Sequence, residues 1–200
     1  GNYDTDMNNI SANLGGGINA LNSNLTLSDL HVTGNAGYLG GGIYVDASST
    51  INLSNSLLDY NQGVLFGGGL NIQGLSILDS VDILHNIGGS GGGIKFENGR
   101  GEISNSRISH NECYYNSPGL ALSGSNWGDS NGDWESMGLI LNHVEIADNL
   151  GGYQVSIQSS TSAGTTNKVE LNNVTIVADP EITGLLSGIR LIGTTTNTLD

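Results

Sequence analysis

The sequence is poor in the residues from which compact domains are usually built and cross-linked. It holds one cysteine and two prolines among 200 residues, and only 36% of its residues are hydrophobic and 12% charged. Because Cys113 is the single cysteine, an internal disulfide framework and a CxxC zinc site are both excluded. The low apolar share disfavours a large spherical core and favours a thin, extended one.

Basic residues are also scarce. Five Lys and Arg residues against 19 Asp and Glu residues give a formal net charge of −14, which repels nucleic-acid phosphates and anionic lipid headgroups. No apolar run reaches the roughly 18 residues of a membrane span. We therefore expect no nucleic-acid partner and no direct membrane insertion of this segment, and the Asn-, Ser-, Thr- and Gly-rich composition indicates an extracellular or cell-surface location.

Glycine, in contrast, is abundant, and much of it recurs in one motif. Three glycines followed by an aliphatic residue begin at Gly15, Gly40, Gly67 and Gly91, about 25 residues apart. Weaker copies begin at Ser117, Gly152 and Leu186, with wider gaps that indicate insertions. Self-similarity at this period is typical of a solenoid.

A second motif lies between the glycine runs. It begins with Leu or Ile, carries an aliphatic residue at its sixth position and ends with Asn or Asp, in the copies Leu27–Asn35, Leu53–Asn61, Leu78–Asn86, Ile103–Asn111, Leu141–Asn149 and Leu171–Asp179. Segments of alternating polarity, such as Ile43–Val45 and Ile94–Phe96, follow the glycines and predict short strands.

Three short strands in about 25 residues fit one coil of a β-helix, whereas a propeller blade requires about 40 residues. We predict an all-β fold, a single-stranded right-handed parallel β-helix of about seven to eight coils. Residues 1–200 are expected to form one domain, with an insertion loop at 124–138 and more degenerate coils at 139–200.

Polar residues at the predicted bends receive structural roles. In a parallel β-helix, equivalent residues of successive coils stack in rows, and Asn tolerates left-handed backbone conformations and can bond its amide to the next Asn. One predicted row contains Asp29, Asn55, Ser80, Asn105, His143 and Asn173. The other contains Asn35, Asn61, Asn86, Asn111, Asn149 and Asp179.

These alternating motifs resemble the GGA[ILV] and FxxN repeats of polymorphic outer membrane proteins. The FxxN-like copies include Val32–Asn35, Ile83–Asn86 and Ile108–Asn111, with an aliphatic residue in place of Phe and Gly in place of Ala. The resemblance covers about residues 9 to 155 and implies an autotransported, β-helical adhesin passenger.

The strand after each glycine run presents two outward rows. They place Asp46, Lys95 and Glu97 on one face, where β-helical polysaccharide lyases and hydrolases bind sugar, and Tyr44 is a candidate ligand contact. Asp46 and Glu97 would lie two coils, about 10 Å, apart, near the upper limit for an inverting carboxylate pair. The alternative is a solvated face with one Lys–Glu pair, because a lyase needs several basic residues.

The insertion at 124–138 is the least repetitive segment. It holds Trp127 and Trp134, which are candidates for ligand or partner contact, and Asp129, Asn131, Asp133 and Glu135, which are candidates for a calcium site. The position where an EF-hand-like loop has its glycine is occupied by Trp134. A tryptophan-anchored loop that covers the side of a coil is the structural alternative.

Two histidines, His85 and His110, occupy equivalent positions of adjacent coils and could share a metal. The same position holds Gly34 and Ala178, which favours an unconstrained surface site instead.

Two classes of function remain open. The first is a non-enzymatic extracellular scaffold, either an adhesin passenger that binds a host or cell-surface protein or glycan, or a fibre subunit that self-associates through open β-helix ends. The second is a carbohydrate-active enzyme that uses Asp46, Lys95 and Glu97. Calcium is the one candidate cofactor.

Overall fold

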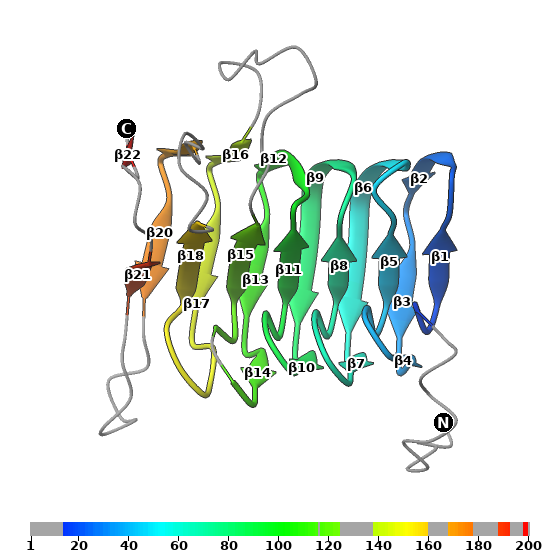
Figure 1. Ribbon diagram of the computed structural model, residues 1–200, viewed down its shortest axis with the longest axis horizontal. Helices are drawn as coiled ribbons and strands as arrows, with labels where there is room; N and C mark the ends of the chain where they lie inside the picture. Colours follow the sequence, from blue (N-terminus) through cyan, green and yellow to red (C-terminus); the bar gives the residue numbers. More distant parts are fainter. Residues whose placement is uncertain are drawn as a thin grey trace.

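The structure is a computed structural model that describes residues 14–115, 117–124, 138–159, 168–177, 188–192 and 198–199. Strands follow one another along a single axis, and every strand pair in the described residues is parallel (Figure 1). The predicted all-β parallel β-helix is therefore confirmed. In this part of the chain no helix is long and apolar enough to span a membrane.

The first sheet is formed by the strands that follow the glycine motifs. Its seven strands lie in chain order: β1 (Ile18–Ala20), β5 (Ile43–Val45), β8 (Leu70–Ile72), β11 (Ile94–Glu97), β15 (Leu120–Gly124), β18 (Val155–Ser159) and β21 (Ile189–Ile192). Each pairs with the equivalent strand one coil away, so that residue 94 lies beside residue 70 on one side and residue 120 on the other.

The second sheet is formed by the nine-residue motifs and has 11 strands. They are β2 (Asn24–Ser28), β3 (His31–Thr33), β6 (Thr50–Asp59), β9 (Leu75–Leu84), β12 (Arg100–Ser104), β13 (Arg107–Ser109), β16 (Gly138–Asn142), β17 (Glu145–Ala147), β19 (Lys168–Asn172), β20 (Thr175–Val177) and β22 (Thr198–Leu199). In β6 and β9 the strand continues through the bend that separates two strands in the other coils.

The third sheet has four short strands: β4 (Ala36–Gly37), β7 (Gln62–Gly63), β10 (Ile87–Gly88) and β14 (Glu112–Cys113). An isolated bridge between Glu112 and Leu150 extends it by one coil. The described residues thus complete about five turns, fewer than the seven to eight predicted, because the later coils add described strands only to the other two sheets.

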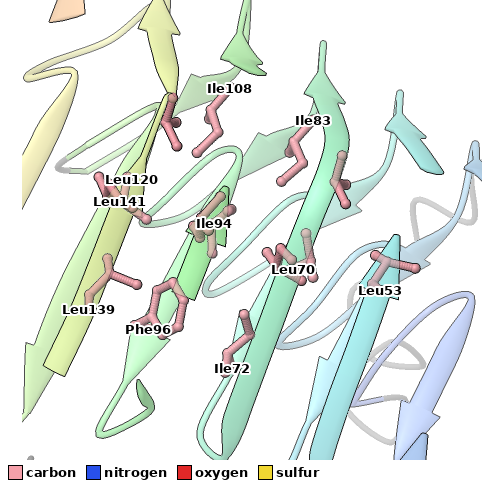
Figure 2. Close-up of a cluster of buried hydrophobic side chains, with 14 of the residues drawn as sticks. Leu53, Leu70, Ile72, Ile83, Ile94, Phe96, Ile108, Leu120, Leu139 and Leu141 are labelled. Carbon is pink, nitrogen blue, oxygen red and sulfur yellow. The ribbon is translucent and has the colours of Figure 1, made fainter. Parts of the chain in front are cut away.

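The core consists of aliphatic side chains stacked in rows along the axis. Figure 2 shows Ile94 and Phe96 on one strand beside Leu70 and Ile72 on the next, all fully buried. Stacking similar residues in successive coils buries apolar surface that one coil alone would leave exposed. This burial stabilises the β-helix by about 25 cal/mol of free energy per Å² of apolar surface.

Left-handed residues form the bends. The first row, Asp29, Asn55, Ser80, Asn105, His143 and Asn173, has φ between 48° and 58° at every position. In the second bend, however, the left-handed residue precedes the repeated Asn: Gly34, Tyr60, His85, His110 and Asp148 have φ between 52° and 66°. The position of Gly34, His85 and His110, which looked unconstrained in the sequence, therefore has a fixed left-handed backbone conformation. The side chain of the Asn that follows points inward.

The second asparagine row is a hydrogen-bonded ladder that is buried from Asn61 to Asn149; Asp179, its last predicted member, lies outside the described residues. From Asn35 through Asn61, Asn86 and Asn111 to Asn149, each side-chain amide donates to the next Asn Oδ1 at 2.9 to 3.1 Å. The same Oδ1 accepts the backbone N–H of the preceding Asn. The ladder ends at Gln154, whose Oε1 replaces the next Asn Oδ1. Gln154 occupies the position of the third glycine in the motif of earlier coils. This change in the motif was the sequence signal that the ladder ends here.

Candidate functional site

An outward row on the first sheet is unusually buried. Tyr44, Asn71 and Lys95 are in register on β5, β8 and β11, which lie side by side (Figure 1). They lie outside the hydrophobic core cluster, yet Tyr44 is 5% exposed, Asn71 0% and Lys95 6%. Tyr44, predicted as a ligand contact, is thus covered.

Lys95 lies under an aromatic ring. Its Nζ is 5.6 Å from the centroid of Phe66, a residue that precedes β8 in the chain and was not singled out from the sequence. Burial lowers the pKa of Lys95 to about 8, although the charge of Glu97 acts in the opposite direction. No hydrogen bond or ion pair joins this ammonium to another of the described residues.

Hydrogen bonds connect Tyr44 to two neighbouring outward side chains, one in each of the next two coils. The Tyr44 hydroxyl donates to Gln73 Oε1 at 3.0 Å, and Gln73 Nε2 donates to Glu97 Oε2 at 2.9 Å. Burial, with the nearby charges of Asp46 and Glu97, raises the pKa of Tyr44. Glu97 is therefore engaged by an uncharged amide, and the predicted Lys95–Glu97 surface ion pair does not form at contact distance in the described residues.

Asp46 is hydrogen-bonded within a turn. Its carboxylate accepts hydrogen bonds from the Ser49 hydroxyl at 2.6 Å and from the backbone N–H groups of Ser48 and Asn22, each at 3.0 Å. The hydrogen bond from Ser49 is the main cause that lowers the pKa of Asp46. These hydrogen bonds give Asp46 a turn-stabilising role.

This geometry predicts a pH-dependent contribution from Asp46. Because its folded-state pKa is lowered, the stabilisation is present above the usual value of 3.8 and is lost as the pH falls through the lower folded-state value. We expect Asp46→Asn to destabilise the protein at neutral pH, with a difference from wild type that shrinks towards zero in strong acid. Urea unfolding at a series of pH values measures this.

Asp29→Asn is the matched control. It removes the same charge at an exposed bend residue that Asn accommodates, so overall electrostatics change equally in both variants. A difference for Asp46→Asn that stays constant with pH, or that equals the control, would contradict the role of the carboxylate.

The Asn71 amide has no partner. Both Asn71 Nδ2 and Oδ1 are buried and make no hydrogen bond, the only such side-chain atoms in the described residues. Buried polar groups are nearly always paired, so this position requires an explanation.

The two histidines of adjacent coils lie side by side in the structure. His85 and His110 rings lie 5.2 Å apart, tilted by 33°, and Tyr60 stacks on His85 at 5.0 Å. Among the residues that the structure describes, no three His, Cys, Asp or Glu side chains are placed to hold one ion. The rings form an exposed stack on the surface of the second bend.

The insertion candidates cannot be placed. Trp127, Trp134, Asp129, Asn131, Asp133 and Glu135 lie outside the described residues.

A feature that the sequence did not indicate is a shallow surface groove of about 430 Å³ beside the first bend. It is lined by Asp29, Leu30, His31, Asn55, Ser56, Leu57, Ser80 and Asp82. At its side His31 Nε2 contacts Asp59 Oδ1 at 2.9 Å.

The fold defines the chain as a parallel β-solenoid protein. No protein-family profile, no curated protein and no solved structure matches it.

Proposed function

We propose that this chain is a non-enzymatic scaffold of an extracellular or cell-surface protein, of the adhesin-passenger type that its repeats resemble. The observation that carries the proposal is the engagement of the outward polar groups between coils. Asp46 accepts hydrogen bonds within a turn, and hydrogen bonds connect Tyr44 to Gln73 and Gln73 to Glu97. Such bonding stiffens a long surface, and its partner would be a host or cell-surface protein or glycan.

A fibre is the alternative form of the same function. In the described residues, β1 and β21 are the end strands of the first sheet, and strand edges support head-to-tail association. We expect concentrated protein to form filaments with the coil axis along their length, visible by negative-stain electron microscopy. Strictly monomeric particles at high concentration would contradict the fibre and leave the adhesin form.

A carbohydrate-active enzyme is the second candidate, because Lys95 has a lowered pKa and lies near Glu97. The test is a panel of acidic and neutral polysaccharides, with and without calcium, assayed for reducing ends and unsaturated products. We expect no turnover. Turnover that disappears in an Asp46→Ala, Glu97→Ala double variant would overturn the scaffold proposal, whereas turnover that persists would place an activity elsewhere.

A further inference from the structure

Two reactive side chains without hydrogen-bond partners lie next to each other on the first sheet. Lys95 of β11 is the direct register partner of Asn71 of β8, and both side chains are on the face away from the core. Parallel strands are separated by about 4.8 Å, so neighbouring side chains on one face are within reach of each other. Both are more than nine-tenths buried.

Each group is unfavourable in isolation. The primary amide of Asn71 has lost water without gaining a hydrogen-bond partner. The Lys95 ammonium is desolvated over the face of Phe66 and makes no hydrogen bond or ion pair with another described residue. Burying an amine and an amide in this way destabilises a fold unless something further joins them.

We propose that Lys95 Nζ and Asn71 Cγ become joined by an intramolecular isopeptide bond. The Nζ lone pair attacks Cγ, a new Nζ–Cγ bond forms, and the Cγ–Nδ2 bond breaks. Nδ2 leaves as ammonia and takes up one proton that Nζ loses. No oxidant or reductant is required, and the two unpartnered groups are replaced by one secondary amide.

The surroundings favour this reaction in three ways. Burial keeps an appreciable part of Lys95 in the nucleophilic, unprotonated form, because its pKa is lowered to about 8. The Phe66 ring covers Lys95 and limits access of the water that would otherwise hydrolyse the amide. Glu97, two residues along the same outward face, is the carboxylate that would carry the proton from Nζ to the leaving nitrogen.

The bond would connect consecutive coils, β8 to β11, and would prevent their separation. This consequence holds for an adhesin, a fibre subunit or an enzyme, so the inference does not depend on the proposed function.

The test is the intact mass of the purified full chain under denaturing conditions, after incubation at pH 8. We expect the sequence mass less one ammonia, and fragmentation spectra that join a peptide containing Asn71 to one containing Lys95. A wild-type chain that retains the full sequence mass would overturn the proposal.

Matched variants separate the bond from other losses of ammonia, such as succinimide formation at Asn98–Gly99 or Asn131–Gly132. Lys95→Arg and Asn71→Ala should have their full sequence masses, whereas Lys168→Arg, at the other lysine of the chain, should keep the deficit. A deficit that persists in Lys95→Arg would overturn the proposal. Glu97→Gln should slow the reaction, and full linkage in that variant would overturn the proton-carrying role of Glu97.

Discussion

Replacement of Asn86 by alanine is expected to lower the free energy of unfolding by about 3–5 kcal/mol. The Asn86 side chain is fully buried and makes four hydrogen bonds. Its Oδ1 accepts from the backbone and side-chain nitrogens of Asn61, and its Nδ2 donates to Leu58 O and Asn111 Oδ1. The substitution leaves these partners buried without replacements, and a buried unsatisfied group costs about 1–3 kcal/mol.

Asn52→Ala is the control for the ladder. Asn52 is exposed on the outer face of β6, so its loss should change the free energy of unfolding by no more than about 0.5 kcal/mol. Urea unfolding followed by circular dichroism measures both variants. Equal midpoints for Asn86→Ala and Asn52→Ala would show that the ladder does not contribute to stability.

Gly68→Ala is the second substitution with a large expected effect, a loss of about 3 kcal/mol or more. A Cβ at this position would lie 2.4 Å from Gly92 O and 2.5 Å from Ile87 O. Both are backbone atoms that pair strands, so they cannot rotate away as a flexible side chain would. The coil must open between the first and third sheets, and the same measurement of urea unfolding should detect it.

Gly34→Asn tests whether lack of space for a side chain is what makes the replacement of a glycine destabilising. Gly34 has φ of 66°, but nothing lies within 4 Å of a Cβ built there. Asn tolerates this left-handed conformation, so we expect little loss of stability. A loss in Gly34→Asn as large as in Gly68→Ala would contradict the steric explanation for the glycine runs.

The part of the candidate site that could be predicted is its placement on one face. Alternation along each strand puts Tyr44, Lys95 and Glu97 outward together, and the coil repeat puts them in adjacent rows. Their surroundings could not be predicted. Phe66 covers Lys95 from a segment before β8, and Ser49 donates a hydrogen bond to Asp46 within its own turn. Such contacts depend on turn geometry and side-chain direction.

The sequence by itself determined the repeating architecture. Equivalent positions in successive coils have the same backbone conformation and burial, so the same residue types recur there. Strands follow the glycine runs, aliphatic residues occupy the core rows, and the residues assigned to the first bend are left-handed. These properties are local to one coil, or repeat from coil to coil, so periodicity alone reveals them.

Only the tertiary structure decided how side chains of different coils meet. It turned Asn86 and its equivalents into a buried ladder, assigned the left-handed conformation to the residue before each of them, and ended the ladder at Gln154. It also placed the unpartnered amide of Asn71 beside Lys95. The register between coils and the burial that it produces create these contacts, and neither is encoded in the spacing within a single repeat.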